Sequence, residues 1–303
     1  MKILITGANG LLGQKLVQLL LDQGETVIAT SHTQSRLGYM EQEFVYDQMD
    51  IRVRDQVMEV VSRHTPDVII HTAAMTNVDQ CETEREACDR LNVDAVQHLV
   101  DAAQVTGAFL VHLSTDFIFD GEGGPYVESD EPNPVSYYGE SKLAAEKIVK
   151  ASKGDWAILR TVLVYGVTPG MSRSNIILWV RDSLTQGKEL KIVDDQWRTP
   201  TLAEDLAMGC YLAAKHRAKG VFNISGKDLL TPYEMAMKTC DYFDLDKSLI
   251  TKVDGSMFSQ PAKRPPKTGF ILDKAKDVLG YDPVGFDEGI RLLDQQLKDM
   301  LVK

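Results

Sequence analysis

The segment "VSYYGESKLAAEK" at residues 135–147 places two adjacent tyrosines close to a lysine. Residues four apart share one face of a helix, so Lys142 would lie beside Tyr138, whereas Tyr137 would point about 100° away. A phenol ordinarily ionises near pH ~10, and a neighbouring ammonium favours the phenolate and lowers that pKa. The pair therefore predicts a general acid and base for carbonyl–alcohol chemistry, with Tyr138 as the working tyrosine and Tyr137 in packing or in a pocket wall.

A third polar group supports this prediction. The stretch "HLSTD" at residues 112–116 closes an apolar run, and α/β sheets bind ligands at the carboxyl ends of their strands. Ser114 or Thr115 could donate a hydrogen bond to a substrate oxygen there. This disfavours the alternative, a solvated helix in which tyrosine and lysine are spaced by chance.

The glycines of "TGANGLLG" at residues 6–13 predict a dinucleotide site. Gly7 permits a tight turn, Gly10 lets the backbone approach a pyrophosphate, and Gly13 allows the helix to lie close to the sheet. The helix N-terminus at Leu11 and Leu12 favours negative charge. An ordinary tight turn is the alternative interpretation.

The loop "ATSHTQSRLG" should lie near the 2′-position of the cofactor. An acidic residue would bind the ribose hydroxyl of NAD there, but Ser31, His32 and Arg36 occupy the loop instead. These groups suit a 2′-phosphate, so NADP is favoured and NAD is the alternative. The three residues could equally be solvated loop positions.

Two further pairs complete the predicted cofactor site. Asp50 could accept a hydrogen bond from the adenine amino group while Ile51 packs on its face. Ala73 and Ala74 end an apolar run with almost no side chain, as close passage of a cofactor requires.

These residues need a scaffold, and the chain alternates between short apolar runs and amphipathic helical stretches. Such alternation predicts βαβ units and a doubly wound parallel α/β sheet covered on both faces. We expect a dinucleotide-binding region over residues 1–166, with residues 200–225 returning to the sheet, and a smaller substrate-binding region over 167–303. The expected strands are residues 2–6, 26–30, 43–47, 67–74, 108–115, 156–166 and 220–225; a long helix is expected over 83–105.

Composition narrows the class of protein. The 303 residues are 44% hydrophobic and 25% charged, which is typical of a globular protein. The net charge of −11 argues against nucleic acid as a partner, and no apolar run approaches the roughly 20 residues of a membrane span. The N-terminus does not resemble a secretory signal, and the four cysteines lack a C-x-x-C pair, so we expect a cytoplasmic protein with unpaired thiols.

No metal site is predicted. His71 and His112 lie inside predicted strands, so we expect their side chains to be packed in the core rather than to bind a metal ion.

The motifs "TGANGLLG", "STDFIFDG", "YYGESKLAAE" and "LRTVLVYG" resemble the extended short-chain dehydrogenase/reductase family in order and spacing over nearly the whole chain. The resemblance implies that Tyr138 is the acid/base, that Lys142 binds the nicotinamide ribose and tunes the tyrosine, and that Thr115 orients the carbonyl. It also implies an active-site role near the cofactor for Asn92, which could otherwise be a helix surface residue. Homodimers are frequent in this family.

Within the family, "AAMTNVDQCE" (73–82), "DQWRTPT" (195–201) and "KRPPKTGFILD" (263–273) resemble the dTDP-4-dehydrorhamnose reductases of dTDP-rhamnose biosynthesis and their relatives. The family's sugar-nucleotide dehydratases follow Thr-Asp with glutamate, because elimination of water needs a second acid/base. This chain carries Phe117 there, which cannot transfer a proton, so dehydration is disfavoured.

The resemblance also implies contacts to a nucleotide-sugar substrate. Arg198 and Arg264 lie where family members often place arginines for the diphosphate, whose oxygens suit the guanidinium fork. Solvated loop charges are the alternative for both. The rhamnose-pathway reductases typically carry tryptophan where this chain has Leu163, which leaves the identity of the sugar open. The implied substrate contacts are Thr115, Asp116, Leu163, Asn175, Arg198 and Arg264.

The sequence therefore favours an NADPH-dependent reductase of a 4-keto sugar on a nucleotide diphosphate. One alternative is a nucleotide-sugar 4-epimerase that retains NAD. The other is a non-catalytic NADP-binding subunit resembling the regulatory beta subunit of methionine adenosyltransferase, because fold alone does not decide activity.

Overall fold

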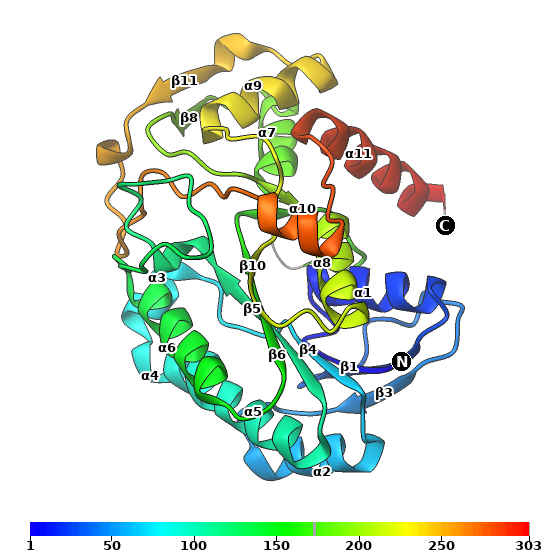
Figure 1. Ribbon diagram of the computed structural model, residues 1–303. Helices are drawn as coiled ribbons and strands as arrows, with labels where there is room; N and C mark the ends of the chain where they lie inside the picture. Colours follow the sequence, from blue (N-terminus) through cyan, green and yellow to red (C-terminus); the bar gives the residue numbers. More distant parts are fainter. Residues whose placement is uncertain (172–173, 303) are drawn as a thin grey trace.

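Seven parallel strands form the central sheet, in the order β10-β6-β5-β4-β1-β2-β3 (Figure 1). The computed structural model describes residues 1–171 and 174–302. The order reverses between β1 and β4, so the carboxyl ends of these two strands flank the crevice in which such folds bind ligands. The strands are β1 (Lys2–Thr6), β2 (Thr26–Ser31), β3 (Val45–Gln48), β4 (Val68–His71), β5 (Phe109–Thr115), β6 (Trp156–Thr161) and β10 (Gly220–Asn223).

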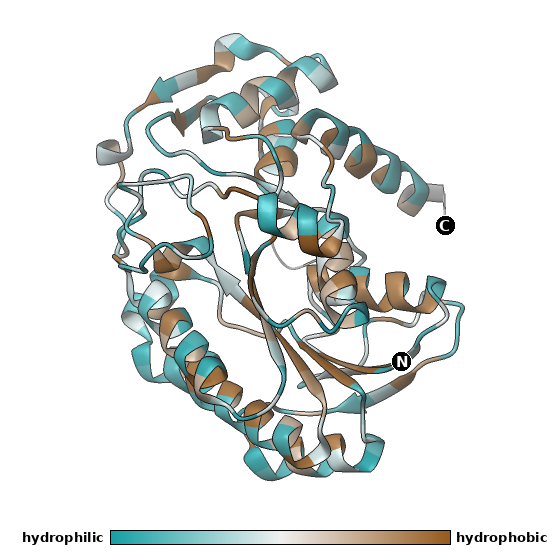
Figure 2. Ribbon diagram, in the orientation of Figure 1, coloured by the Kyte–Doolittle hydropathy of each residue, from teal (hydrophilic) through white to brown (hydrophobic). Residues whose placement is uncertain are grey.

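Helices cover both faces of this sheet, and alternate strand residues enter two separate cores. Ile3 and Ile5 of β1 pack in the core beneath α1 (Leu11–Asp22) and α8 (Ala203–Lys215). Leu4 packs in the other core, beneath α2 (Arg54–His64), α5 (Ala95–Thr106) and α6 (Tyr137–Ala151). Figure 2 shows the inner strands as largely apolar, and α2, α5 and α6 as carrying both polar and apolar residues. The predicted doubly wound parallel sheet is thereby confirmed.

Two of the predicted elements are interrupted. The expected strand over 156–166 ends at Thr161 and resumes as β7 (Val164–Tyr165), which pairs with β9 (Thr201–Leu202) in a separate sheet. Leu163 between them has a positive φ of 34°, which turns the chain out of the large sheet.

The expected helix over 83–105 consists of α4 (Arg85–Asp89), a π-helical turn (Arg90–Asp94) and α5. It follows the short helix α3 (Val78–Thr83), from which the non-helical backbone of Glu84 (φ −120°, ψ 52°) separates it.

The C-terminal region stacks on the carboxyl edge of the sheet and has apolar clusters of its own. Its second small sheet pairs β8 (Leu190–Val193) with β11 (Ile250–Val253). The helices of this region are α7 (Ile176–Thr185), α9 (Pro232–Phe243) and α11 (Phe286–Val302). The helix α10 (Asp273–Leu279) instead packs Ala275 and Leu279 in the sheet core beneath α1 and α8. Across the described residues, no helix combines the length and the apolar character needed to cross a bilayer.

Candidate active site

The glycine loop between β1 and α1 has the geometry of an anion site. Gly7 has a positive φ of 72°, and a Cβ added there would lie 2.9 Å from the backbone nitrogen of Ala73 in the loop after β4. A Cβ on Gly13 would lie 2.2 Å from the carbonyl oxygen of Gly7, so the helix packs directly against the loop. Gly10 is the N-cap of α1 and provides no side-chain cap, and the first turn contains no acidic residue. The backbone N–H groups at Leu11 and Leu12 are thus open to a phosphate.

The loop after β2 is held against this glycine loop by Asn9. The Asn9 side chain donates to the carbonyl oxygen of Gln34 at 2.8 Å and accepts from the backbone nitrogen of Arg36 at 2.9 Å. The side chains of His32 and Arg36 are exposed, and Ser31 is buried at the end of β2. Hydroxyl, imidazole and guanidinium groups therefore gather beside the dinucleotide loop, an arrangement that fits a 2′-phosphate.

Asp50 and Ile51 have protein partners in this structure. The Arg52 side chain donates to both carboxylate oxygens of Asp50, at 2.9 and 2.7 Å, and this hydrogen bonding is the main reason why the pKa of Asp50 lies below its ordinary value. Ile51 is buried in the core beneath α2 and α5. An adenine amino group would have to compete with Arg52 for the carboxylate.

Tyr138 and Thr115 come together at the carboxyl end of β5. The Tyr138 side chain is buried close enough to Thr115 for that hydroxyl to favour the ionised phenol, while Thr115 Oγ1 itself donates to Asp116 Oδ1 at 3.1 Å. Burial raises the pKa of Tyr138 well above its ordinary value, and the charge of Asp116 acts in the same direction, against the effect of Thr115. The predicted lowering of this pKa is wrong, because desolvation of the phenol outweighs the effect of Thr115, which favours the ionised form.

Lys142 lies one helical turn along α6 from Tyr138. Its Nζ donates to the carbonyl oxygen of Leu113 at 2.6 Å, and burial lowers the pKa of its ammonium to about 8. His71 and His112 stack beneath it with ring centroids 5.4 Å apart, and burial lowers the pKa of His71 to about 3. Both rings are therefore neutral core groups at neutral pH. Among the described residues, no group of three or more His, Cys, Asp and Glu side chains could hold a metal ion.

Asn92 lies in the π-helical turn and joins two parts of the site. Its Oδ1 accepts from the backbone nitrogen of Met75 at 2.8 Å, and its Nδ2 donates to the Met75 carbonyl at 3.1 Å and to Ser141 Oγ at 3.2 Å. The side chain is buried, so here it braces the loop after β4 against α6. π-Helical turns are often found at functional sites, but spacing alone predicted an uninterrupted helix here.

Tyr137 points away from the predicted catalytic group. Its hydroxyl donates to Asp89 at 2.7 Å and its ring lies 4.5 Å below the Arg85 guanidinium. The hydrogen bond to Asp89 is the largest cause of a pKa raised to about 12. Of the two adjacent tyrosines, Tyr138 alone faces Thr115.

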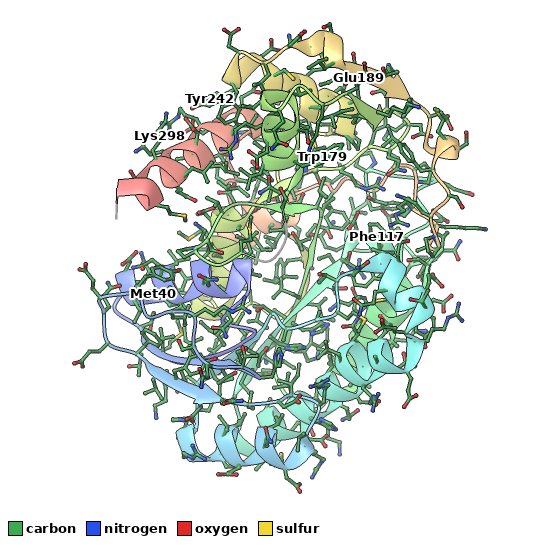
Figure 3. All side chains as sticks on the ribbon, turned by 180° about the vertical axis from the view of Figure 1, so that it is seen from behind. Met40, Phe117, Trp179, Glu189, Tyr242 and Lys298 are labelled. Atoms are coloured by element: carbon green, nitrogen blue, oxygen red, sulfur yellow. The ribbon has the colours of Figure 1, made fainter. Side chains whose placement is uncertain are left out.

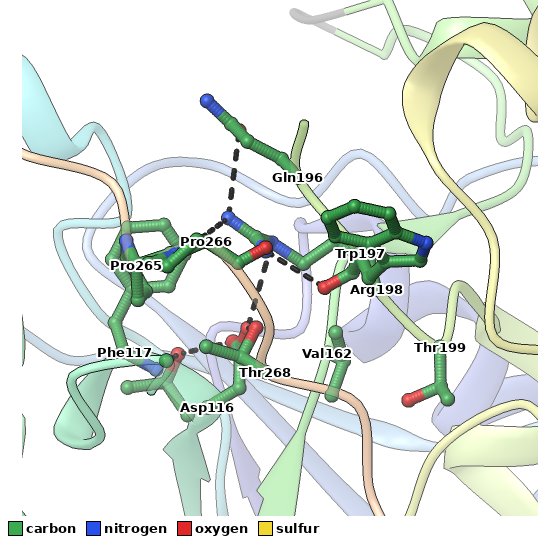
Figure 4. Close-up of polar contacts among 12 residues, drawn as sticks. Asp116, Phe117, Val162, Gln196, Trp197, Arg198, Thr199, Pro265, Pro266 and Thr268 are labelled. Atoms are coloured by element: carbon green, nitrogen blue, oxygen red, sulfur yellow. Dashed lines mark hydrogen bonds and ion pairs between the residues drawn. The ribbon is translucent and has the colours of Figure 1, made fainter. Parts of the chain in front are cut away.

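Arg198 is buried and its guanidinium contacts the protein itself (Figure 4). It donates to the carbonyl oxygens of Trp197 and Pro265 at 2.8 and 2.7 Å. Its Nε lies 3.9 Å from Oδ2 of Asp116, which also accepts a short hydrogen bond from Thr268. This cluster fastens the 265–268 segment to the end of β5. Sequence reasoning missed Thr268, because nothing in the spacing brings the segment to β5.

Arg264 is likewise paired, with a carboxylate that sequence reasoning also missed. Its two terminal nitrogens donate to the two oxygens of Asp79, both at 2.7 Å. The arginine is the main cause of the lowered pKa of Asp79. The predicted diphosphate arginines are thus internally bonded in this structure, and a substrate would bind them in exchange for these partners.

The other predicted substrate contacts differ in their surroundings. Asn175 caps α7, accepting from the backbone nitrogens of Ile177 and Leu178 at 3.1 Å. Leu163 is 45% exposed. Phe117, labelled in Figure 3, lies where the C-terminal region meets β5, and its ring is 5.8 Å from that of Tyr138. The exposed Leu163 and the Phe117 ring are apolar, whereas the Asn175 side chain is already occupied as a cap.

The parallel sheet, the open glycine loop at its switch point and the Thr115–Tyr138–Lys142 cluster define an NAD(P)-dependent oxidoreductase of the Rossmann type. The family model described as "RmlD substrate binding domain" matches residues 1–298, and the chain belongs to that family.

Individual relatives cover nearly the same span. The chain is 30% identical over 301 residues to the probable low-salt glycan biosynthesis reductase Agl14 of Haloferax volcanii, covering 97% of this chain and 98% of that protein. It is 32% identical over 260 residues to methionine adenosyltransferase 2 subunit beta of Bos taurus, covering 84% and 76%. The structure of dTDP-4-dehydrorhamnose reductase from Bacillus anthracis in complex with NADP matches with a TM-score of 0.86 and 28% identity, covering 97% and 99%.

Proposed function

We propose that this protein reduces the 4-keto group of a nucleotide-diphosphate sugar with NADPH. The observation that carries the proposal is the position of the buried Tyr138 side chain beside Thr115 at the carboxyl end of β5, with Lys142 one turn further along α6. The similarity to a dTDP-4-dehydrorhamnose reductase and to a glycan biosynthesis reductase supports the substrate class.

Each residue of the pair would have a distinct task. The reduced nicotinamide, when bound, would supply a hydride to the carbonyl carbon. Thr115 would donate a hydrogen bond to the carbonyl oxygen, and Tyr138 would pass its phenolic proton to that oxygen as negative charge develops. A phenol whose pKa is raised by burial remains protonated at neutral pH, as a proton donor for reduction must. Lys142 would bind the nicotinamide ribose and help to restore the tyrosine.

The open loop after β2 supports NADPH over NADH. The 2′-phosphate would lie among Ser31, His32 and Arg36, while Gly10, Leu11 and Leu12 would hold the pyrophosphate. Ala73 and Ala74 would border the cofactor, and the other predicted contacts, Asp50 and Ile51, would lie toward adenine.

The nucleotide sugar would enter between the end of β5 and the C-terminal region. Phe117 and Leu163 would contact the sugar, while Arg198 and Arg264 would bind the diphosphate after release from their internal partners. Phenylalanine beside Tyr138 has no proton to transfer, which favours reduction over dehydration.

The test is oxidation of NADPH, followed by its absorbance, with dTDP-4-dehydrorhamnose generated in situ and NADH in a parallel reaction. We expect faster turnover with NADPH, and a product whose 4-keto group has become a hydroxyl. If the protein binds NADPH but turns over neither this substrate nor other 4-keto sugar nucleotides, the proposal fails.

A second candidate is favoured by the 32% identity to a methionine adenosyltransferase subunit. In that case the chain would bind NADP and associate with a synthetase without turning over a sugar. Co-purification with a methionine adenosyltransferase, together with absence of turnover, would support this alternative.

The four cysteines carry thiols rather than disulfides, which supports a cytoplasmic location. We also propose a homodimer, as is frequent in related reductases. Light scattering of the purified protein at several concentrations would test it.

A further inference from the structure

Two cysteines lie against the working tyrosine. Cys81 of α3 and Cys88 of α4 are both buried and form one apolar cluster with the ring of Tyr138. The Cys81 thiol donates to the carbonyl oxygen of Met75 at 3.7 Å and lies close enough to Cys88 to favour the ionised form of that thiol. The helices that carry them have six and five residues and meet at Glu84, so neither forms a long rigid element. The structure therefore contains a dithiol directly behind the group that would transfer the proton.

Cys88 is also bonded to the residues that brace the site. Its thiol donates to Ser141 Oγ at 3.4 Å and accepts from Asn92 Nδ2 at 3.4 Å. Ser141 precedes Lys142 on α6, and Asn92 holds the loop after β4 through Met75. A movement of the Cys88 sulfur would therefore change hydrogen bonds on both sides of the cluster.

The chemistry of Cys88 differs from that of the two distant cysteines. The contact with Cys81 is the largest cause of a pKa lowered to about 7 for the Cys88 thiol. Burial raises the pKa of Cys210 and Cys240, which pack in other cores. The thiolate is the reactive form of cysteine, so Cys88 is the better nucleophile.

We propose that Cys81 and Cys88 form an oxidation site for hydroperoxides, and that the resulting disulfide lowers turnover at Tyr138. The Cys88 thiolate attacks the terminal peroxide oxygen, the O–O bond breaks, and an alcohol or water leaves with a proton. The resulting sulfenic acid is then attacked by the Cys81 thiol, which forms the S–S bond and releases water. Two thiols are oxidised by two electrons and one peroxide is reduced, so the steps balance.

The disulfide would alter the site because its length is fixed. An S–S bond is about 2.05 Å long, much shorter than any non-bonded contact between two sulfur atoms, so at least one sulfur must move. Displacement of Cys88 breaks its contacts with Asn92 and Ser141 and shifts the surface on which Tyr138 rests. A misplacement of about 1 Å can cost on the order of 100-fold in rate. Because the thiols are buried, oxidation requires transient opening of the short helices.

The experiment treats the full-length protein with hydrogen peroxide and follows two readouts. Maleimide labelling of the denatured chain counts thiols, and peptide mass mapping locates a disulfide. Reduced protein has four thiols, and we expect two to disappear into a bond between Cys81 and Cys88, reversibly with dithiothreitol. Turnover, a readout that rests on the proposed function, is expected to fall roughly 10- to 100-fold.

Variants distinguish this site from general oxidation. Cys81→Ser and Cys81→Ala should both form no such disulfide, and the turnover that each retains should resist the same treatment; Cys210→Ala should respond as the wild type. A thiol count that stays at four, or a mapped disulfide with unchanged turnover, would overturn the inference. If the reduced protein turns over no sugar nucleotide, the proposed function fails, whereas the disulfide map still decides whether the oxidation site exists.

Discussion

Replacing Arg198 by alanine tests whether this residue mainly binds substrate or mainly stabilises the fold. If its guanidinium were free to bind the diphosphate, its loss would raise KM and leave stability almost unchanged. In the structure its side chain is only 6% exposed, donates to carbonyl oxygens at 2.8 and 2.7 Å, and lies 3.9 Å from the buried carboxylate of Asp116. We therefore expect a large loss of folding free energy.

The magnitude follows from these contacts. A hydrogen bond from a charged donor contributes roughly 1.5–3 kcal/mol, and removal of one partner of a buried ion pair costs about 3–5 kcal/mol. The contributions overlap, since one guanidinium makes all of them. Burial raises the pKa of Asp116 and Arg198 opposes that rise, so in the variant Asp116 would bind a proton more readily, which limits the loss. We expect about 3–5 kcal/mol in total for Arg198→Ala.

Urea unfolding monitored by tryptophan fluorescence measures this loss, with Arg264→Ala as the matched control. Arg264 and its partner Asp79 are 18% and 34% exposed, so their pair is screened and contributes about 1 kcal/mol or less. A loss below about 1 kcal/mol for Arg198→Ala, with an unchanged slope against urea, would refute the reasoning from burial. The residue would then act mainly on the substrate, as a raised KM would show.

Four further variants and one control variant test the site. Tyr138→Phe should bind NADPH by calorimetry with nearly the wild-type affinity and lose at least about 100-fold in turnover; retained turnover would place the acid elsewhere. Because burial lowers the pKa of Lys142 to about 8, its ammonium loses its proton as the pH rises through that value, so kcat/KM for NADPH should decline there. Lys142→Met should be slow and show no such step, and a wild-type profile that stays flat up to the ordinary range of lysine would contradict the assignment. Gly13→Ala would place a Cβ 2.2 Å from a carbonyl oxygen, so it should weaken NADPH binding and cost about 1–3 kcal/mol in urea unfolding, whereas Gly38→Ala, with open space around it, should change neither. Arg36→Asp should reverse the preference for NADPH over NADH in steady-state assays, and an unchanged ratio would make this arginine a solvated loop residue.

Local patterns were sufficient to predict most of the scaffold. Continuous apolar runs separated by amphipathic helices permit few solutions other than a parallel sheet with two covered faces, and this sheet is observed. The four-residue spacing of Tyr138 and Lys142 and the three-residue spacing of the glycines depend only on helix and turn geometry, which neighbouring residues determine. The break at Leu163 and the π-helical turn at Asn92 could not be read in this way, because the apolar periodicity continues through both.

The electrostatics and the partners of the site were decided by the tertiary structure. Desolvation of Tyr138 depends on every element packed around it, so its pKa moved opposite to the direction that the neighbouring lysine alone suggests. Arg198 and Arg264 look like free cations in the sequence, but residues distant in the chain, Asp116 and Asp79, lie beside them once the chain is folded. The sequence by itself predicted the facing pair of Tyr138 and Lys142 and the glycine loop from short-range spacing, and its resemblance to a family implied the other candidate groups. The fold determined which of them are neutral, paired or exposed, because burial and charge act through space and not along the chain.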